Sequence, residues 1–413
     1  MTGTSAPLLP SPTEPRRLLG AWARRPPRSH RHTGEALIGA VEAAGLRGRG
    51  GAGFPTARKL RTVAAGRDPV VVANGCEGER LSGKDRVLLC AAPQLVIEGI
   101  ELAAGAVGAR EAAICVHPGG PQASSLGAAL AARPAGGVRI DLVEVPARYV
   151  ASEESALVNL INTGKALPTA KPPRPFERGV RGRPTLVDNV ETLAHIALIA
   201  RYGAGWYRGC GTAESPGTAL VTLGGALARP GVYEVPFGLT LGQVFDAAGG
   251  PREPVQAILT GGYAGTWLPA ATAFGLRLGY PEFAAANAAL GVGTLTPLPA
   301  RGCGLTETAQ ILHYLATESA GQCGPCMFGL PAIAEDFGEL VAGGPPARAA
   351  AKRLRNRLPV ISRRGACGHP DGAVRLANSA LRVFEADLAA HVAGRPCRGA
   401  GRLLLPARAE GVR

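Results

Sequence analysis

The sequence predicts three folded parts in chain order: an α/β domain at 33–205, a small β-grasp-like domain at 215–300 and an all-helical domain at 305–395. Three observations support this prediction. Strand-like and helical segments alternate in the first part, which is typical of a largely parallel sheet covered by helices. Short strands surround one helix in the second part, and only helical periodicity continues in the third. Residues 1–32, rich in Pro, Arg and Ser, are expected to be a disordered tail, and residues 396–413 a second tail.

The expected elements of the α/β domain follow from the spacing of apolar residues and from the capping, glycine and proline residues that begin or end each segment. Thr33 can cap a helix over 34–44, because Leu37, Ile38 and Val41 share one face. A glycine-rich loop at 45–56 precedes a short helix that contains Lys59. The remaining strands are expected at 69–74, 112–117 and 138–145, and the remaining helices at 91–107, 121–133, 151–162 and 188–200, with a Pro/Arg-rich loop at 166–184.

The two smaller domains have simpler patterns. In the β-grasp-like part, strands are expected within 218–225, 231–238 and 256–262, and a helix within 241–250. In the last part, helices are expected at 306–320, 329–342, 346–357 and 372–393.

Composition excludes several classes of protein. Hydrophobic residues make up 46% and charged residues 18% of the 413 residues, so the chain can bury a sizeable core. The net charge is +14, and only five of the 45 basic residues are lysine. This arginine excess fits either the codon bias of a GC-rich genome or an acidic partner. Aromatic residues are only 5%, which argues against nucleic-acid binding by base stacking. We find no membrane-spanning stretch and no signal peptide, so a cytoplasmic protein is expected.

The glycine-rich loop is the first candidate binding site. Gly48, Gly50 and Gly53 fit the pattern G-x-G-x-x-G, but the loop follows a predicted helix rather than a strand, which disfavours an ordinary dinucleotide-binding fold. Glycines allow a positive φ, and consecutive N–H groups that face one way bind anions. Arg49 and Lys59 add positive charge. The loop therefore predicts a site for a phosphate-bearing cofactor, with a ligand-free turn as the alternative.

Acidic residues follow predicted strands. Glu77 and Glu79 come directly after the first strand, and Glu153 and Glu154 follow a strand-like stretch. Ligands of open α/β sheets bind beyond the carboxyl ends of the strands. These carboxylates, together with Lys171 in a proline-stiffened loop, are therefore candidate contacts to a cofactor or ribose; solvated surface charge is the alternative for each.

The cysteines do not suggest a disulfide framework, since there are nine and no secretion signal is evident. Cys323-Gly-Pro-Cys326 has three interpretations. A disulfide-exchange site is disfavoured because no strand–turn–helix context surrounds it. A zinc site could use Cys323, Cys326, Cys367 and His369. An iron–sulfur cluster held by the three thiolates is the third.

Six motifs together resemble one known family. They are GLRGRGGAGFPT (45–56), EGE with KDR (77–79 and 84–86), RYVASEESALVN (148–159), KPP (171–173), PTLVDNVETLAH (184–195) and ESAGQCGPC (318–326). In this order they resemble the flavin-carrying, NADH-oxidising subunit of respiratory complex I and its relatives in soluble hydrogenases and formate dehydrogenases. The resemblance covers about residues 33–395.

The resemblance implies a flavin-binding α/β domain, a β-grasp domain and a helical iron–sulfur domain, and it assigns residues to cofactors. The implied FMN contacts are Arg49, Gly50, Gly51, Gly53, Lys59, Asn74, Glu77, Tyr149, Asn189 and Thr192. The implied NADH contacts are Phe54, Glu79, Glu153, Glu154 and Lys171. The implied ligands of a [4Fe–4S] or [3Fe–4S] cluster are Cys323, Cys326 and Cys367, with His369 as a possible fourth ligand.

The chain departs from the family pattern at five positions. Ala320 stands where the family has its first cluster cysteine. The others are Cys76 for Asp, Ser152 for Gly, Arg174 for Phe and Asp188 for Asn. An arginine plane at 174 can still stack on a base, or could prefer a phosphorylated ribose.

The resemblance implies an NADH dehydrogenase subunit. NADH would give a hydride to FMN, and single electrons would pass to the iron–sulfur centre and then to an acidic iron–sulfur or ferredoxin-like partner, in a quinone-linked or soluble complex. Association with a membrane would occur only through partner subunits. Two alternatives stay open: a ferredoxin-linked flavoprotein that does not use NADH, motivated by the basic surface and Arg174, and a degenerate assembly subunit, motivated by Ala320.

Overall fold

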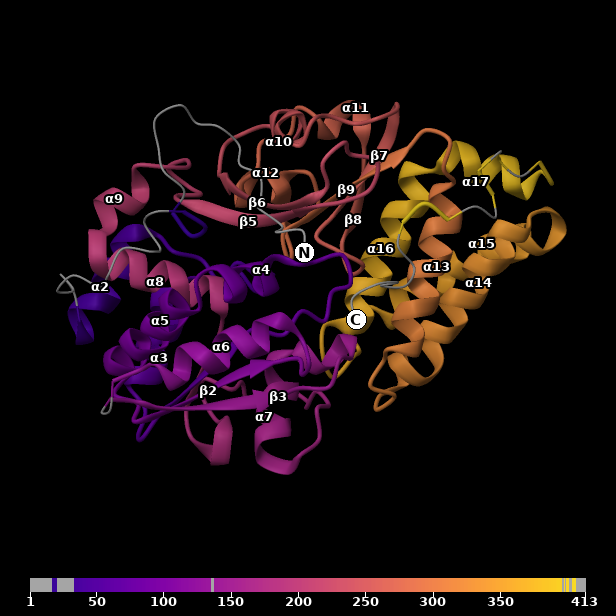
Figure 1. Ribbon diagram of the computed structural model, residues 1–413. Coiled ribbons are helices and arrows are strands. Elements are labelled where there is room, and N and C mark those ends of the chain that lie inside the picture. Colours follow the sequence, from indigo (N-terminus) through magenta and orange to yellow (C-terminus); the bar gives the residue numbers. More distant parts are fainter. Residues whose placement is uncertain are drawn as a thin grey trace.

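The computed structural model describes residues 17–20, 33–134, 137–395, 397, 399–400 and 403–405. Figure 1 shows three adjoining parts: an α/β part in indigo and magenta, a β-rich part above it, and a bundle of helices in orange and yellow beside both. This arrangement confirms the predicted fold class.

The α/β part is built on a four-stranded parallel sheet. Its strands are β1 (Val70–Asn74), β2 (Glu111–Val116), β3 (Arg139–Glu144) and β4 (Thr185–Asn189), in the order β3-β2-β1-β4. Its helices are α2 (Gly34–Ala44), α3 (Thr56–Ala64), α4 (Lys84–Ala91), α5 (Pro93–Val107), α6 (Pro121–Ala131), α7 (Glu154–Thr163), α8 (Val190–Tyr202) and α9 (Ala204–Arg208), with 3-10 helices at Tyr149–Ser152 and Val180–Gly182.

Hydrophobic cores cover both faces of this sheet. Successive side chains of a strand point to opposite faces. In β1, Val71 and Ala73 lie in the large core formed with α2, α5 and α8, whereas Val70 and Val72 lie in a smaller core with Leu157 of α7. A strand buried on both faces explains the unbroken apolar run in the sequence.

Strand β4 corrects the sequence prediction, which had a loop up to residue 184 and a helix from residue 188. All five residues of β4 are buried, and they pair with β1 in parallel register. Asn189 ends the strand and caps α8, since its side chain accepts a hydrogen bond from the N–H of Glu191. No turn residue separates strand from helix, so the sequence shows no boundary there.

The β-rich part contains a five-stranded mixed sheet. Its elements are β5 (Thr218–Leu223), β6 (Gly231–Pro236), α10 (Leu241–Ala247), β7 (Val255–Thr260), β8 (Thr266–Pro269), α11 (Ala270–Ala273), α12 (Tyr280–Ala285) and β9 (Thr294–Pro299). The order is β6-β5-β9-β7-β8, with only β5 and β9 parallel. Strands β8 and β9 were not identified from the sequence. Along β7, Ile258 faces the core with α10, while Ala257 and Leu259 face the helical part.

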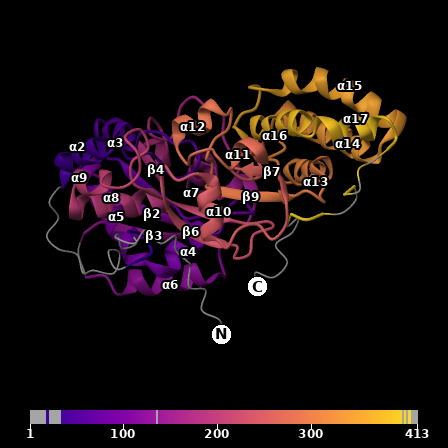
Figure 2. The same ribbon diagram turned by 90° about the horizontal axis from the view of Figure 1, so that it is seen from above.

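The helical part packs on this sheet (Figure 2). Its helices are α13 (Gly304–Thr317), a π-helix at Pro325–Gly329, α14 (Leu330–Ala342), α15 (Gly344–Ile361), α16 (His369–Val383) and α17 (Glu385–Val392). The expected helix at 372–393 is thus two helices that meet at Phe384. Buried Trp267 of β8 joins the two parts, because its backbone N–H donates to Ser379 and its indole N–H to Thr308, each at 3.0 Å.

The two predicted tails lie largely outside the described residues. Of residues 1–32, only 17–20 are described, and these are packed rather than disordered: Leu18 is buried and its N–H donates to the Glu234 carboxylate at 3.0 Å. Of residues 396–413, Leu405 is buried, and its N–H donates to Glu307. The limits of the domains and tails stay predictions.

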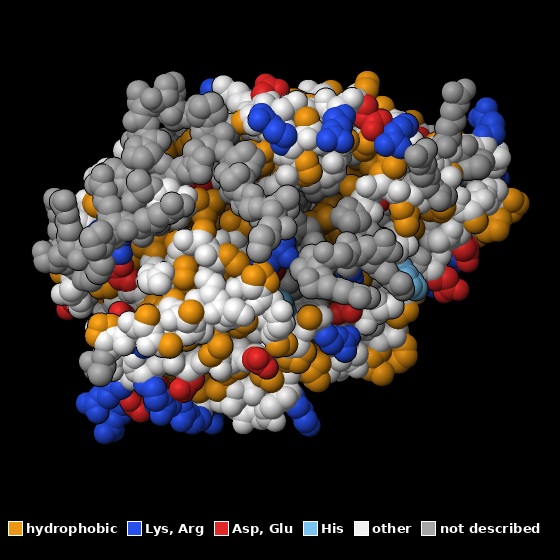
Figure 3. Space-filling model, viewed as in Figure 1, with side chains coloured by type: hydrophobic (Ala, Val, Ile, Leu, Met, Phe, Trp, Pro, Cys, Tyr) orange, Lys and Arg blue, Asp and Glu red, His pale blue; other side chains and the backbone are white. Residues whose placement is uncertain are grey.

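Two further features concern the distribution of surface charge and the hydropathy of the helices. In Figure 3, the Lys and Arg side chains form several separate groups on the visible face, some with acidic side chains beside them, rather than one continuous patch. In the described part of the chain, no single helix is long and apolar enough to cross a membrane; the bent pair α4 and α5 passes by length and composition only.

Candidate functional site

The glycine-rich loop lies over the carboxyl ends of β1 and β4. Gly51 and Gly53 have φ of 121° and 61°, where side chains other than glycine's are strained. A Cβ at Gly53 would stand 2.8 Å from the Tyr280 ring. Among the described residues, the N–H groups of 50–53 have no hydrogen-bond acceptor. These free donors fit an anionic ligand such as the phosphate of FMN.

Arg49 anchors the loop instead of projecting freely. Its N–H donates to Thr192 at 2.9 Å, and its buried guanidinium donates to the hydroxyls of Tyr280 at 2.7 Å and Tyr207 at 2.9 Å. It also pairs with Glu191 at 3.6 Å. The loop is therefore fastened at once to α8, α9 and α12, which fixes the position of its free N–H groups.

Lys59 and Asp188 form an ion pair beneath the loop. Lys59 Nζ lies 3.1 Å from Asp188 Oδ1 and donates to the carbonyl of Val187 at 2.8 Å. Burial raises the pKa of Asp188, and Lys59 opposes this shift. Asp188 Oδ2 is buried without a partner in the described structure. A buried unpaired oxygen costs free energy, so this atom fits a site that a hydroxyl or N–H of a ligand completes.

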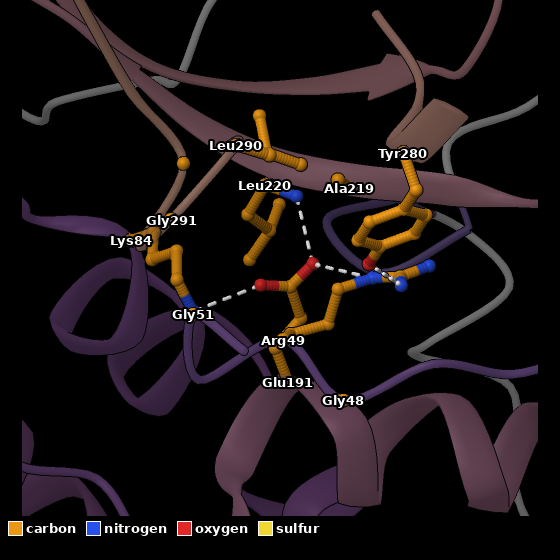
Figure 4. Close-up of a pocket in the computed structure, with 11 residues that line it drawn as sticks. Gly48, Arg49, Gly51, Lys84, Glu191, Ala219, Leu220, Tyr280, Leu290 and Gly291 are labelled. Atoms are coloured by element: carbon orange, nitrogen blue, oxygen red, sulfur yellow. Dashed lines mark hydrogen bonds and ion pairs between the residues drawn. The ribbon is translucent and has the colours of Figure 1, made fainter. Parts of the chain in front are cut away.

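A buried ionic network missed by the sequence analysis supports the loop from the other side. Glu191 lies between Lys84 at 2.9 Å and Arg49, and accepts the N–H of Leu220 at 2.8 Å (Figure 4). Burial would raise the pKa of Glu191, but Lys84, His195 and Arg49 lower it to about 2. The motif letters KDR and VETLAH contain both residues, yet nothing local indicates that they meet across 107 positions.

This network lines a small cavity below the loop. Its walls include Gly48 and Gly51 on one side and Tyr280, Leu290 and Gly291 on the other. The free volume is about 10 Å³, close to that of one water molecule. The cavity therefore belongs to the packing of the loop and is too small for a flavin.

Asn74 and Glu77 hold the segment that follows β1. Asn74 donates to the carbonyl of Ser152 at 2.9 Å and accepts the N–H of Cys76 at 3.1 Å. Glu77 accepts the N–H groups of Asp85 and Arg86, each at 3.1 Å, and so caps α4. Both residues lie at the carboxyl end of the sheet as predicted, but their side chains make contacts within the protein; their roles toward FMN stay predictions.

Glu79 is a buried carboxyl at the meeting point of the three parts. It accepts the N–H of Tyr263 at 2.7 Å, the N–H of Leu81 at 3.2 Å and the hydroxyl of Tyr149 at 3.4 Å. Burial raises its pKa to about 7 in spite of these hydrogen bonds. Tyr149 in turn packs its ring against His369, with centroids 5.3 Å apart. Glu79 thus links the end of β1 to the helical part.

This raised pKa makes stability depend on pH. A carboxyl that holds its proton more tightly when folded stabilises the fold fully below its unfolded pKa of about 4.5, and that contribution is lost as the pH rises to about 7. Glu79→Gln should therefore reduce the fall in unfolding free energy between these pH values by up to about 1.4 kcal/mol per pH unit. Urea unfolding across this range measures the slope. Exposed Glu35→Gln is the control, and an unchanged slope in Glu79→Gln would contradict the assignment.

Lys171 forms a bridge between two predicted NADH contacts. Its ammonium lies 2.6 Å from Glu153 and 2.8 Å from Glu154. Glu153 also caps α7 by accepting the N–H of Ser155 at 2.8 Å. Phe54 stands apart from this cluster, half-buried in the glycine loop with the Arg58 guanidinium 5.8 Å from its ring centre.

The structure brings the three predicted cluster cysteines near one another. Burial raises the pKa of Cys326 to about 12, and the neighbouring thiols of Cys323 and Cys367 add to the shift. Burial also acts on Cys323, but N–H groups of Ala366 and Cys326 donate to its sulfur and lower its pKa below the ordinary value. N–H donors to sulfur are typical of iron–sulfur sites. Three thiols therefore fit three ligands of a cluster.

Ala320, at the position of the family's first cluster cysteine, offers no ligand atom. The backbone N–H of Ala320 donates to Cys326, so the alanine lies beside the thiols with only a methyl side chain. His369 is engaged elsewhere: its Nε2 lies 2.7 Å from the Leu315 carbonyl, and its Nδ1 has no partner in the described residues. Its role as a fourth ligand stays a prediction. Cys397 lies with Cys303 and His391, in a different cluster.

Comparison with known proteins gives three matched segments. Residues 41–198 match the Nuo51 FMN-binding domain, residues 220–262 the SLBB domain, and residues 306–391 the NADH-ubiquinone oxidoreductase-F iron–sulfur binding region. The NADH-quinone oxidoreductase F-subunit 2 of Rhizobium meliloti (strain 1021) is 30% identical over 386 residues, which cover 89% of this chain and 91% of that protein. The chain belongs to the family of NADH-quinone oxidoreductase F-subunits.

Other relatives are similarly identical but match over different lengths. The corresponding F-subunit of Mycobacterium tuberculosis (strain ATCC 25618 / H37Rv) is 32% identical over 87% of this chain and 85% of its own length. The NAD-reducing hydrogenase HoxS subunit alpha of Cupriavidus necator is 32% identical over 71% of this chain and 50% of its own. Two solved structures of NAD⁺-reducing [NiFe]-hydrogenase, H₂-reduced and air-oxidised, match with TM-scores of 0.78 and identities of 34% and 32%.

These two structural matches cover 86% and 90% of this chain, but only 62% and 66% of the solved chains. Membership of the family confirms the resemblance stated from the motifs, and with it FMN, NADH and an iron–sulfur centre as the cofactors and substrate of the family. The individual contacts to these groups stay predictions.

Proposed function

We propose that this protein oxidises NADH by hydride transfer to FMN and passes electrons singly to an iron–sulfur centre and a partner protein. One observation supports this most strongly. The segment 149–154, which carries Glu153 and Glu154, contacts the helical part: the N–H of Tyr149 donates to Glu318 at 3.0 Å, and its ring packs against His369 with centroids 5.3 Å apart. The expected NADH-binding segment therefore adjoins both the glycine loop domain and the helical part that carries the cluster thiols.

On the flavin side, the chain would bind and orient FMN. The free N–H groups of 50–53 would receive the FMN phosphate, and Lys59 would share its charge between that region and Asp188. Bound FMN supplies the chemistry, because it accepts a hydride and releases electrons one at a time. Asn74, Glu77, Tyr149, Asn189 and Thr192 would form the surrounding frame, each already held by the hydrogen bonds described above.

On the nucleotide side, charge and shape point to a pyridine nucleotide. Glu153 and Glu154 offer oxygens that can accept ribose hydroxyl hydrogen bonds, and Lys171 offers a cation for a phosphate. The carboxyl of Glu79 is buried against Tyr263 and Tyr149, so its role toward NADH stays a prediction. Phe54 offers a half-exposed ring for stacking. Arg174 is exposed near this segment, and an arginine there can stack on a base. We therefore propose NADH as the substrate of this protein.

At the cluster, the surface suits a protein partner. Met327 and Phe328, next to Cys326, are 52% and 72% exposed. Exposed large apolar side chains beside an electron carrier are typical of a docking surface. We propose that an acidic iron–sulfur or ferredoxin-like partner docks here, that the protein acts in the cytoplasm, and that any contact with a membrane or quinone occurs through partner subunits.

Anaerobic reduction separates this function from its alternatives. The purified protein should contain FMN and lose its flavin absorbance when NADH is added. A ferredoxin-linked flavoprotein would bleach with reduced ferredoxin but not with NADH, and a degenerate assembly subunit would contain no flavin. Neither alternative is favoured by the similarity to NADH-quinone oxidoreductase subunits.

Iron analysis tests the cluster. Anaerobically prepared protein should contain about three to four irons and about four sulfides per chain, and lose them in air, because Ala320 supplies no ligand at the fourth corner. Cys326→Ser should remove the iron, while Cys90→Ser, at an exposed thiol, should retain it. Fewer than ~0.5 irons per chain in wild-type protein with normal flavin content and helical signal would leave the cluster unsupported.

A further inference from the structure

A second set of metal-ligating side chains lies outside the proposed redox site. Cys303 Sγ, His391 Nε2 and Cys397 Sγ all lie within 4.8 Å of one another. Cys303 and His391 are fully buried, and Cys397 is partly buried. These cysteines looked unrelated in the sequence, since 94 positions separate them. We propose that this set is a structural zinc site that fastens the C-terminal segment to the helical part.

The distances fit zinc. In a tetrahedral zinc site the metal–sulfur and metal–nitrogen bonds are about 2.3 and 2.0–2.1 Å, which places ligand atoms about 3.5–3.8 Å from one another. Cys303 Sγ and His391 Nε2 are 3.7 Å apart. Two thiolates, one neutral imidazole and Zn²⁺ sum to zero charge, so the complete site can stay buried without an unpaired charge.

The histidine is oriented as a zinc ligand. Its Nδ1 lies 3.0 Å from the carbonyl oxygen of Leu340. A carbonyl only accepts hydrogen bonds, so Nδ1 carries the proton and Nε2 holds the lone pair. This lone pair lies 3.7 Å from Cys303 Sγ and accepts the N–H of Cys397 at 3.3 Å, a hydrogen bond that a bound zinc would replace. A hydrogen bond from the other ring nitrogen to a backbone carbonyl is the usual support of a metal-bound histidine. Cys303 is also positioned: it caps α13 and accepts the N–H of Thr306 at 3.4 Å.

The backbone near these three side chains is closely packed against the start of α13. The segment after Cys397 lies so close to 301–303 that a Cβ on Gly399 would stand 2.6 Å from the N of Cys303. Farther along, Leu404 and Leu405 donate their N–H groups to buried Glu307. The zinc site would thus be the first of two anchors of this segment. A water molecule would complete four ligands.

Zinc analysis of the full-length protein tests the proposal. Wild-type protein should contain about one zinc per chain, and zinc X-ray absorption should report two sulfur and one imidazole ligand. Cys397→Ser, at the least buried ligand, and His391→Gln should each lose the zinc. Cys90→Ser should retain it, and Cys326→Ser should lose iron but not zinc.

A measurement on the wild-type protein tests the site without the risk that a variant misfolds. Removal of zinc by a chelator should increase hydrogen exchange of residues 399–400 and 403–405 by ~10-fold or more while exchange in α2–α8 stays unchanged. Three results would overturn the proposal: no zinc in a protein whose three side chains are free, a disulfide between Cys303 and Cys397 in its place, or zinc that disappears with Cys326→Ser and persists in Cys397→Ser.

Discussion

Gly53→Val is expected to lower the FMN content of the purified protein at least ~10-fold. The reason is twofold. Residue 53 has φ of 61°, which costs a side chain other than glycine's about 1–2 kcal/mol. The new Cβ would also stand 2.8 Å from the Tyr280 ring, so either the ring or the loop must move. Either movement displaces the free N–H groups of 50–53.

The flavin-to-protein absorbance ratio after desalting measures this effect. Gly164→Val is a matched control, because Gly164 has φ of 78° at the end of α7 and a Cβ there would meet no atom within 4 Å. It carries similar backbone strain at a distance from the loop. If Gly53→Val retains flavin at the wild-type ratio, the loop is not the phosphate site.

Lys84→Met should destabilise the protein by about 3–5 kcal/mol, because it leaves buried Asp85 without its cation and leaves buried Glu191 with only Arg49, at 3.6 Å. Lys84 is 3% exposed in its side chain and lies 2.7 Å from Asp85 and 2.9 Å from Glu191. Its ammonium also donates to the Asn189 side chain at 3.2 Å. The loss therefore extends to the cap of α8 and to the floor of the glycine loop.

Urea unfolding compares Lys84→Met with Lys352→Met, where the lysine is exposed on α15 and a change of at most ~0.5 kcal/mol is expected. Equal unfolding free energies for the two variants would show that the network does not stabilise the fold. Flavin content should fall with Lys84→Met even where the protein stays folded, since the network holds Arg49 and Asn189 in place.

Local sequence patterns predicted those features whose place in the fold depends only on a short stretch of the chain. The glycine loop, the helix over 34–44 and the buried run of β1 depend on neighbours in sequence, and the structure has them at the expected places. Asn189 was assigned from its motif, but its strand was missed because β4 passes straight into α8. A strand without a turn residue at its end leaves no boundary in the sequence.

Most of the contacts that could not be predicted from the sequence join residues that lie far apart along the chain. Glu79 looked like a ribose-binding carboxylate after a strand, and only the fold brings Tyr263 and Tyr149 to it. Lys84 and Glu191 carry opposite charges in two motifs, yet their burial together depends on how β5 and α12 cover the loop. For the same reason, Cys303 and Cys397 gave no sign of proximity.

NADH is expected to deliver a hydride to FMN bound in this chain. Stopped-flow mixing of the anaerobic flavoprotein with NADH, and with NADH deuterated at the transferred position, tests it most directly. We predict rapid bleaching of the flavin, slowed by deuterium, followed by reduction of the iron–sulfur centre. A flavin that dithionite reduces but NADH leaves oxidised would contradict the account.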